Sequence, residues 1–301
     1  MERDPLSDVL DVLGAQVVRR TRMEAGGPWA FAFPAANRLK FVAVLEGEQW
    51  ILTENEPRCL MKKGDVCLLG RTSYVVASDP ELEPQNGTFL FPERGSDFAR
   101  VGSGDGVVAI GGSIVFPDEN GDFLLDMLPG FLLVGREASG AGAIAAVLDM
   151  ISKEILRGAM GAGIVAARLA DVLVVEALRT LSHDGDRGLT GWLGAISDPR
   201  LGRALRAVHR EVASPWTVAA LAEVAGMSRA AFSAQFSQQV GRPPLAYLRY
   251  WRLTLARALL RKDSNSVDEI ARRVGYTSQS AFSNAYRQAF KTTPRSRMRV
   301  A

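Results

Sequence analysis

Polar side chains that can recognise DNA bases lie close together near the end of the chain. They are Gln279, Ser280, Ser283, Asn284 and Arg287. Glutamine and asparagine side chains can form paired hydrogen bonds with adenine, and arginine can form them with guanine. Spacings of three and four residues bring such side chains to one face of a helix. This stretch is therefore a candidate recognition helix for a DNA major groove.

A second set with the same spacing lies earlier in the chain. It comprises Arg229, Ala230, Ser233, Ala234 and Ser237. Alanine can contact a thymine methyl group but supplies no hydrogen bond, so this face offers fewer contacts that distinguish bases. We expect base specificity to depend mainly on the later helix, with Asn284 as a determinant. The earlier helix is expected to contribute more through phosphates.

Residues typical of a helix-turn-helix position the first set. Ala222 is small enough for two helices to cross closely, and Gly226 follows where a helix must end with a positive φ. Ser228 can then cap the next helix through its hydroxyl. The buried stripe of that helix repeats every four residues and comprises Phe232, Phe236 and Val240.

The same pattern recurs 49 residues later, from Ile270 to Tyr286. Ala271 and Gly275 correspond to the alanine and glycine of the first copy, and Phe282 and Tyr286 correspond to its two phenylalanines. Both copies end in a turn closed by proline. The duplication makes DNA binding a far more specific prediction than a single match would.

Charge divides the chain into two parts. From Asp198 to the end there are 18 Lys and Arg against 6 Asp and Glu, whereas the preceding part holds 18 and 27. This asymmetry indicates a polyanion partner for the basic part. Some arginines near helix ends are expected to contact phosphate, and the others to stay on the surface: Arg242, Arg249, Arg252, Arg295 and Arg297. Helix N-termini at Thr217, Ser228 and Ser278 can also meet phosphates.

Capping signals delimit the remaining helices of the basic part. Asp198 followed by Pro199 predicts a helix start. Residues 243–261 predict a long helix that both packs and separates the two copies. Ser266 with Glu269 forms a capping box for the next helix, and a short last helix is expected after Pro294.

The preceding part, from about residue 19 to residue 117, has a β-rich pattern. Short apolar runs predict strands at Trp29–Phe33, Phe41–Leu45, Gln49–Leu52, Val66–Leu69 and Val107–Ile110. Glu46-Gly47-Glu48 is expected to form a hairpin tip, and Lys63-Gly64-Asp65 another turn. Many short strands with no helical period between them favour a sandwich or a small barrel.

The hydrophobic period becomes helical from about Gly142. Two amphipathic helices are expected, separated by a break at Gly158–Gly163. Two interpretations of their apolar surface stay open, namely packing against the β-rich domain and a contact between two copies of the chain. The polar, glycine-rich stretch from His183 to Gly191 is expected to be a linker.

No group of residues suggests an enzyme. The only histidines are His183 and His209, and no Cys or His spacing is typical of a metal site. Gly102–Gly106 lacks the Lys-Ser/Thr of a phosphate-binding loop and is expected to join two strands. We therefore expect no catalytic residue, no metal and no cofactor.

Cysteine usage and hydropathy indicate a cytoplasmic protein. Cys59 and Cys67 do not make a disulfide framework, and they are either buried apolar residues or a redox-switched pair. The first residues lack the regions of a signal peptide. The longest apolar stretch, from Gly163 to Leu178, is interrupted by charged residues, which argues against a membrane span.

Candidate ligand-binding residues fall into two groups. Arg19, Arg20 and Arg22 form a basic cluster in the acidic part, either as a solvated strand face or as a site for an anionic effector such as a phosphate or nucleotide. A ligand inside the β-rich domain would be expected to contact the second group. That group comprises Arg38, Lys40, Trp50 and Tyr74.

The duplicated motif closely resembles the AraC/XylS family of bacterial transcription regulators. The resemblance covers about Asp198 to Arg299 and includes Gly241-Arg-Pro-Pro-Leu-Ala-Tyr247 and Val274-Gly275-Tyr276. It implies two helix-turn-helix subdomains, joined by the long helix, that enter successive major grooves on one face of DNA. Three residues depart from the family pattern: Ala234 and Asn284 replace a frequent Arg, and Lys291 replaces the usual Gly, so the last turn is expected to be strained or differently shaped.

The N-terminal part resembles the cupin-type effector domain of one branch of that family. The resemblance rests on Trp29–Pro34, Phe41–Gly47 and Lys63–Leu69. Ser73-Tyr74 stands where many relatives have Pro-His, and the β-rich region contains no histidine. A metal-dependent cupin enzyme is therefore not expected, and the domain is expected to bind an effector or to mediate dimerisation.

Together these features predict an α+β protein with an N-terminal cupin-like β-barrel or sandwich, a helical linker and an all-α C-terminal domain. The expected boundaries are 1–140 for the sensor domain, 141–192 for the linker and its possible dimerisation helices, and 196–301 for the DNA-binding domain, with helix-turn-helix motifs at about 217–240 and 267–290. The predicted function is a transcription regulator. The alternative is a cupin-fold enzyme, or a redox or anionic-ligand sensor, with a DNA-binding appendage. Expected partners are double-stranded DNA, a small-molecule effector, RNA polymerase and a second copy in a homodimer, with no membrane.

Overall fold

The chain forms two compact units in a computed structural model that describes residues 4–92, 96–116, 121–157, 159–183, 191–262 and 266–297. The sheet unit contains residues 16–115 and 128–187. The helical unit contains the C-terminal part from Gly188 together with two earlier segments, Met1–Ala15 and Phe116–Met127. The chain therefore passes between the two units more than once.

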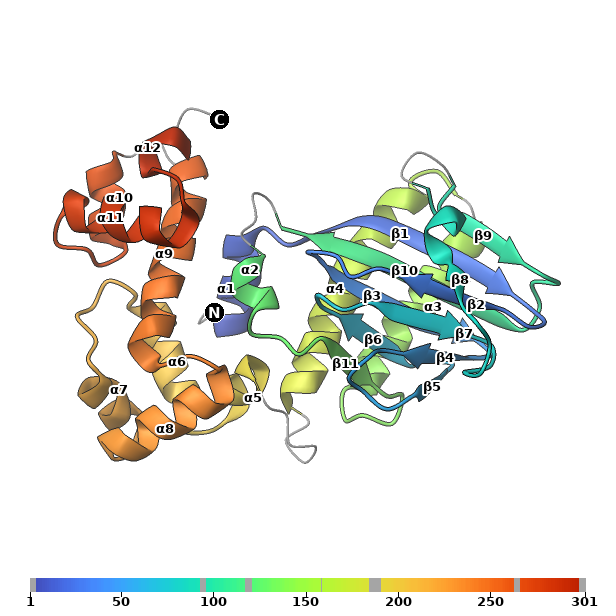
Figure 1. Ribbon diagram of the computed structural model, residues 1–301, viewed down its shortest axis with the longest axis horizontal. Coiled ribbons are helices and arrows are strands. Elements are labelled where there is room, and N and C mark those ends of the chain that lie inside the picture. The colour runs from blue at the N-terminus through green and yellow to red at the C-terminus, as the bar shows by residue number, and fades with distance from the viewer. Residues whose placement is uncertain are drawn as a thin grey trace. The chain divides into compact units, whose positions relative to one another are not determined.

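The sheet unit is built from two β-sheets (Figure 1). The strand order is β11-β6-β3-β10-β1-β9 in the six-stranded sheet and β5-β4-β7-β2-β8 in the other. β1 pairs with β9, and β2 with β8, in parallel, whereas the other pairs are antiparallel. The strands are β1 (Gln16–Ala25), β2 (Ala30–Phe33), β3 (Leu39–Glu46), β4 (Glu48–Leu52), β5 (Cys59–Lys62), β6 (Val66–Leu69), β7 (Tyr74–Ala77), β8 (Gln85–Asn86), β9 (Phe98–Val101), β10 (Val107–Val115) and β11 (Phe131–Val134). The predicted β-rich domain is confirmed in its two-sheet form.

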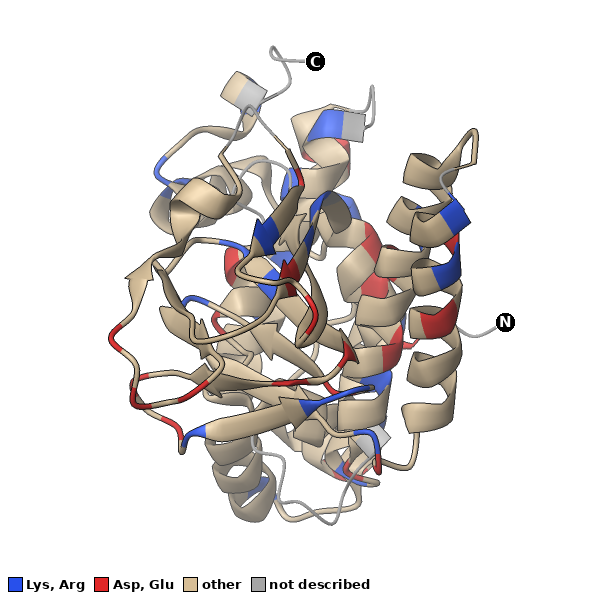
Figure 2. Ribbon diagram, turned by 90° about the vertical axis from the view of Figure 1, so that its right-hand side faces the viewer, with Lys and Arg blue, Asp and Glu red and all other residues tan. Residues whose placement is uncertain are grey.

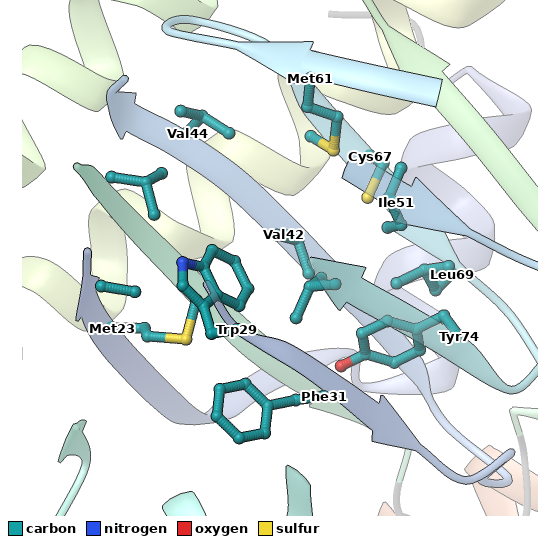
Figure 3. Close-up of a cluster of buried hydrophobic side chains, with 13 residues drawn as sticks. Met23, Trp29, Phe31, Val42, Val44, Ile51, Met61, Cys67, Leu69 and Tyr74 are labelled. Carbon is teal, nitrogen blue, oxygen red and sulfur yellow. The ribbon is translucent and has the colours of Figure 1, made fainter. Parts of the chain in front are cut away.

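Apolar side chains from both sheets meet to form the core of this unit. Figure 3 shows Trp29, which precedes β2, and Phe31 of β2 together with Val42 of β3, Ile51 of β4 and Tyr74 of β7. Alternate residues of a strand point to opposite faces of its sheet, so each strand contributes every second residue to this core. Burying these side chains is the main favourable term in the stability of the unit.

The predicted hairpin at Glu46-Gly47-Glu48 is wrong. β3 belongs to the six-stranded sheet and β4 to the five-stranded one, so this turn carries the chain from one sheet to the other. Gly47 has a φ of 73°, and a Cβ at this position would collide with the backbone of Gly106. A glycine at positive φ suits a hairpin and a sheet-crossing corner equally well, so the local sequence does not separate them. The turn at Lys63-Gly64-Asp65 is confirmed, and it too joins the two sheets, between β5 and β6.

Two long helices, α3 (Ala141–Arg157) and α4 (Ala162–His183), pack against the six-stranded sheet. The backbone N–H of Val17 on β1 donates to Asp171 Oδ1 of α4 at 2.9 Å, which fixes helix to strand. Both predicted helices are confirmed. The predicted linker begins too early, because α4 continues through His183; the rest of that stretch up to Gly191 lies outside the described residues.

The acidic excess of the N-terminal part is visible on the surface of the sheet unit. Figure 2 shows Asp and Glu along the loops that join its strands. Some acidic residues form ion pairs with nearby cations, such as Glu46 with Lys63 at 2.7 Å and Glu48 with Lys62 at 3.7 Å. Exposed pairs of this kind contribute little to stability.

The helical unit is organised around α9 (Pro244–Lys262), which lies between two groups of short helices (Figure 1). The predicted bounds of this helix, 243–261, are confirmed to within one residue. The other helices are α1 (Pro5–Leu13), α2 (Asp122–Leu125), α5 (Trp192–Ser197), α6 (Leu201–Arg210), α7 (Val218–Ala225), α8 (Arg229–Val240), α10 (Val267–Arg273), α11 (Gln279–Phe290) and α12 (Pro294–Arg297). Asp198 Oδ1 accepts hydrogen bonds from the backbone N–H groups of Arg200 and Leu201, both at 2.8 Å, and so holds the turn that leads into α6. The helix begins two residues later than predicted, and its N-cap position is Arg200.

Two segments from the N-terminal part pack among the C-terminal helices, which the sequence did not suggest. α1 contacts α6 and α9, and α2 contacts α9. The ring of Phe123 lies 5.1 to 5.7 Å from the rings of Tyr247, Tyr250 and Trp251. The predicted boundaries at 140 and 196 stay predictions, and these contacts show that the C-terminal core includes side chains from outside them.

Candidate nucleic-acid interface and ligand cavity

Capping and glycine geometry build the first helix-turn-helix as predicted. Thr217 Oγ1 accepts from the backbone N–H of Ala220 at 3.1 Å and caps α7. Gly226 ends that helix with a φ of 68°. Ser228 Oγ accepts from the N–H of Ala231 at 3.3 Å and starts α8. The turn is thus fixed by hydrogen bonds within the motif.

The second copy repeats this geometry. Ser266 and Glu269 form the predicted capping box at the start of α10, and Ser278 Oγ accepts from the N–H of Ala281 at 3.2 Å at the start of α11. Gly275 has a φ of 85°. In each copy the residue after the glycine donates its backbone N–H to the carbonyl of the small alanine in the first helix. The distance is 2.9 Å from Met227 to Ala222 and 2.9 Å from Tyr276 to Ala271.

Both recognition helices bury one face and leave the other open. Phe232 and Phe236 of α8 and Phe282 and Tyr286 of α11 are almost completely buried. The predicted contact residues lie on the remaining surface, and every one of them is exposed or half-exposed. They are Thr217, Ser228, Arg229, Ala230, Ser233, Ala234, Ser237, Ser278, Gln279, Ser280, Ser283, Asn284 and Arg287. Both faces are therefore accessible to a ligand of the helical unit.

A pair of arginines supports the two copies from the preceding helices. Arg203 of α6 donates to the carbonyls of Val224, at 3.2 Å, and Ala225, at 2.7 Å, at the end of α7. Arg252 of α9 donates to the carbonyls of Val212 at 2.9 Å, Ser214 at 2.7 Å and Gly275 at 3.3 Å. The two arginines are 49 residues apart, the same offset as the two motifs, so the repeat extends into α6 and α9. This offset was available in the sequence and could have identified them.

The structure changes the interpretation of several arginines expected near phosphate. The guanidinium of Arg252 donates to backbone carbonyls and therefore links the loop before α7 to the turn after α10. Arg242 forms an ion pair with Asp126 at 2.7 Å and lies over the ring of Tyr250 at 4.5 Å. Arg249 donates to Gln288 Oε1 at 2.9 Å. Arg295 is exposed, and the side chain of Arg297 lies outside what the structure describes.

Lys291 ends α11 in the left-handed conformation. Its φ is 57°, and no other non-glycine residue in the described ranges has a positive φ. The corresponding end of α8 is Gly241, with a φ of 76°. A side chain costs about 1–2 kcal/mol in this conformation. Of the two expectations, a strained or a differently shaped turn, the positive φ supports the first, because both helices end in the left-handed conformation.

His209 belongs to the buried core of the helical unit. Its Nε2 lies 2.8 Å from the hydroxyl of Tyr247, which also accepts from Trp192 Nε1 at 3.0 Å. Burial lowers the pKa of His209, against the opposing effect of Asp8, whose Oδ2 is 3.7 Å from Nδ1. The imidazole therefore has a structural role in this core.

The sheet unit contains a cavity of about 460 Å³ between its two sheets. This volume falls within the range of small-molecule sites. Arg19, Arg38, Lys40 and Tyr74 are the predicted ligand-binding residues that line it. The sequence reasoning missed Gln49, which also lines it and is buried on β4.

The alternation of side chains along a strand explains why some predicted ligand-binding residues do not line the cavity. Arg19 faces the cavity, whereas Arg20 and Arg22 lie at a separate crevice between the six-stranded sheet and α3 and α4. The arginine cluster is therefore divided between two faces of β1. Trp50 does not line the cavity, because its neighbours Gln49 and Ile51 occupy the inward positions of β4; naming it as an interior candidate was wrong.

The cationic end of the cavity is partly removed from water. Lys40 Nζ lies 4.9 Å from the centre of the Tyr74 ring and donates to the carbonyl of Pro34 at 3.2 Å. Burial, together with the charge of Arg38, lowers the pKa of Lys40 to about 8. Burial raises the pKa of Tyr74, so its hydroxyl stays protonated near neutral pH.

The two cysteines are free thiols in the sheet unit. Cys67 is buried and Cys59 half-buried. Burial raises the pKa of both thiols, which disfavours the reactive thiolate. Within the described ranges no three or more His, Cys, Asp or Glu side chains gather in a way that could hold a metal ion.

A duplicated helix-turn-helix joined to a two-sheet domain defines the class of protein, a DNA-binding transcription regulator. Comparison with known families agrees: a cupin family model matches residues 4–183, and a helix-turn-helix domain model matches residues 221–299. The chain belongs to the AraC-like transcription regulators that carry an N-terminal cupin domain.

Relatives share this organisation along the whole chain. A putative AraC-like transcription regulator of Streptomyces lividans is 36% identical over 97% of this chain and 96% of its own length. The HTH-type transcriptional regulator AlkR of Acinetobacter baylyi is 28% identical over 97% of this chain and 98% of its own length. A crystal structure of an AraC-type regulator from Chromobacterium violaceum is 32% identical, covers 35% of this chain and 94% of its own, and has a TM-score of 0.33.

None of the helices in the described ranges is long and apolar enough to cross a membrane.

Proposed function

We propose that this regulator binds promoter DNA by inserting α8 and α11 into successive major grooves of one duplex. The observation that supports the proposal is the pair of matched, accessible faces, each held by the same capping serine and glycine turn. The helix N-termini at Ser228 and Ser278 direct backbone N–H groups and a positive dipole end outward, which suits phosphate contacts. Basic side chains of the C-terminal part supply the remaining attraction to DNA.

In this proposal the cavity of the sheet unit binds a small-molecule effector. It lies between the sheets of a cupin-type domain and combines apolar walls with Arg38, Lys40 and Gln49. Apolar cavities with a few convergent polar groups are the usual form of a ligand site. The cupin domain then acts as a sensor without enzymatic activity, and the protein works in the cytoplasm, where its DNA and RNA polymerase are.

Exposed apolar side chains on α3, α4 and their connection support a homodimer. Six of them are at least 43% exposed, which is unusual for large hydrophobic residues gathered on one helix pair: Met150, Leu156, Met160, Ile164, Val165 and Val172. A second copy covering this surface would bring two DNA-binding domains to paired half-sites. Leu156→Glu is expected to shift sedimentation equilibrium to the monomer. Phe89→Glu, which alters an exposed aromatic residue away from these helices, should leave the dimer intact.

Negative charges introduced on the recognition faces test the proposed DNA contacts. Ala230 and Ser280 are exposed at equivalent positions of α8 and α11. Ala230→Glu or Ser280→Glu in the full chain should abolish sequence-specific binding in a fluorescence anisotropy titration, because a carboxylate would face the negatively charged duplex. Gln85→Glu, exposed on the sheet unit, is the matched control. Unchanged affinity in both recognition variants, with circular dichroism as in the unaltered protein, would contradict the proposal.

The whole chain is the appropriate reagent for these tests. A fragment that starts at residue 196 would lack Trp192, whose indole N–H donates to Tyr247, and Phe123, which packs on the same tyrosine. Contact with RNA polymerase is a separate prediction, checked by in vitro transcription from a promoter that the protein binds.

A further inference from the structure

A buried amide lines the cavity without a hydrogen-bond partner. The side chain of Gln49 is 1% exposed, and within the described part of the chain neither its Oε1 nor its Nε2 has a partner. Buried polar groups of native proteins are nearly always paired. Gln49 lies on the inward face of β4, as does Ile51 of the apolar core, so the amide belongs to the interior between the sheets. It can both donate to and accept from a bound molecule.

The charges of the cavity are all positive. Arg19, Arg38 and Lys40 line it, and its lining contains no Asp or Glu. The charge of Arg19 is compensated, because its Nε lies 2.9 Å from Asp97 Oδ1. Among the described residues, Arg38 and Lys40 form no ion pair with a carboxylate. Lys40 is half-buried, and Arg38 is exposed. A half-buried cation is stabilised by an anion beside it, so the cavity suits a negatively charged group next to Lys40.

Apolar and aromatic side chains form much of the remaining wall. Phe33 and Tyr74 stack with their ring centres 5.1 Å apart, and Met23, Val42 and Val76 continue the apolar surface. These walls favour a flat apolar body, because aromatic rings pack well against each other.

We propose that the cavity binds a small aromatic carboxylic acid that carries a second hydrogen-bonding group. Its carboxylate contacts Arg38 and Lys40, its ring packs along Phe33 and Tyr74, and its hydroxyl or amide pairs with Gln49. The inference rests on the proposed role of the cavity as the effector site and adds the chemical class of the effector.

Three matched probes test the ligand class by isothermal titration calorimetry on the full chain. They are para-hydroxyphenylpropionate, its neutral amide, and phenylpropionate, which lacks the hydroxyl. The first is expected to bind most tightly. The amide should bind at least about tenfold more weakly, because it lacks the charge. Phenylpropionate should also lose about tenfold, because it leaves the Gln49 amide unpaired.

Two cavity variants assign these preferences to residues. Lys40→Met should remove most of the preference for the acid over its amide, and Gln49→Leu should remove the preference for the hydroxylated probe. Gln49→Leu should also raise the melting temperature of the free protein, because it removes an unpaired buried amide. Lys63→Met and Gln85→Leu alter exposed residues of the same unit and should leave both preferences intact.

The pH dependence of binding provides a readout that a purely structural role would not change. Affinity for the acid should fall from pH 7 to pH 9 as Lys40 loses its proton around pH 8. The other charged groups that line the cavity are the guanidinium groups of Arg19 and Arg38. The raised pKa of Tyr74 keeps its hydroxyl neutral in this window. In Lys40→Met the affinity should be nearly constant over the same range.

Each failure has a distinct meaning. Equal affinity for the acid and the amide would overturn the ligand class. If Gln49→Leu nevertheless weakened the binding of both probes, the cavity would remain the effector site. Acid binding that both cavity variants leave unchanged would overturn the effector cavity as well. No measurable binding of any probe at millimolar concentration would overturn the class. Specific DNA binding by each variant, measured in parallel, shows that the protein is folded and tests the regulator function separately.

Discussion

The two helix-turn-helix copies share a backbone plan but differ in the residues that they present. α8 offers alanine and serine around Arg229, whereas α11 offers Gln279, Asn284 and Arg287. The turn glycine and the capping serine are the same in both copies, because they fix the backbone rather than the contact. Duplication therefore preserved the parts that make the motif fold and left the contact faces free to differ in their number of hydrogen-bonding groups.

The copies also differ in how they are supported. Arg203 contacts two carbonyls at the end of α7, while Arg252 contacts three carbonyls that belong to the surroundings of both copies. At the opposite end, α8 stops at a glycine and α11 at a lysine in the same left-handed conformation. Arg252 thus ties the turn after α10 to the loop before α7, whereas Arg203 acts only at the end of α7. The second copy has the more strained end at its recognition helix.

Removing the arginine anchors should produce the largest difference between the copies. Arg252→Ala is expected to lower the free energy of unfolding by about 3 kcal/mol, since hydrogen bonds from a charged group contribute about 1.5–3 kcal/mol each and are not additive. Arg203→Ala should cost about 1–2 kcal/mol, because its guanidinium is more exposed and contacts fewer carbonyls. Urea denaturation followed by circular dichroism measures both values. Arg295→Ala, at an exposed arginine of the same unit, is the control, and equal losses for Arg203 and Arg252 would contradict the proposed asymmetry.

Exchanging the helix-end residues should give a smaller effect with opposite signs. Lys291→Gly should raise the free energy of unfolding by about 1 kcal/mol, because glycine adopts positive φ without steric cost. Gly241→Lys should lower it by a similar amount. A Cβ at Gly241 would have no atom within 4 Å, so this variant reports backbone strain alone. Thermal unfolding detects both changes, and a stabilised Gly241→Lys protein would refute the explanation.

Single arginines on the recognition helices should have the smallest effects. Arg229→Ala and Arg287→Ala are each expected to reduce the slope of log affinity against log salt concentration by about 1, if each arginine neutralises one phosphate. Arg229→Ala should weaken binding equally for all sequences, whereas Arg287→Ala should also alter base preference. Titrations at several salt concentrations with specific and scrambled DNA separate these outcomes. An unchanged slope in either variant would remove that arginine from the interface.

Local features of the DNA-binding domain could be predicted because they depend on neighbours in sequence. Ser228 caps its helix, Gly226 permits the turn, and the strain at Lys291 follows from its position after a helix. Arg252 was placed among five arginines expected either at phosphate or on the surface, because its burial cannot be judged from its neighbours in sequence. Its equivalence to Arg203, which lies one repeat earlier, was the signal that would have corrected this assignment.

Features that depend on contacts between distant residues could not be predicted from the sequence. Gly47 fits a hairpin and a corner between sheets equally well, and only the partners of β3 and β4 distinguish them. Phe123 joins the C-terminal aromatic core from a segment more than 100 residues away in sequence. Gln49 was overlooked and Trp50 chosen because adjacent residues of a strand face opposite sides of the sheet. The sequence alone does not show which of the two faces the interior.

Selection of binding sites from random DNA by the full chain tests most directly whether both recognition helices contact one duplex and the second carries most of the specificity. Within each half-site the unaltered protein should select two blocks of sequence about 10–10.5 base pairs apart, with stronger base preference in one of them. Asn284→Ala should erase preference within the stronger block and leave the other unchanged, and Ala234→Asn should strengthen the weaker block. A single selected block, or an Asn284→Ala profile identical to that of the unaltered protein, would contradict this account.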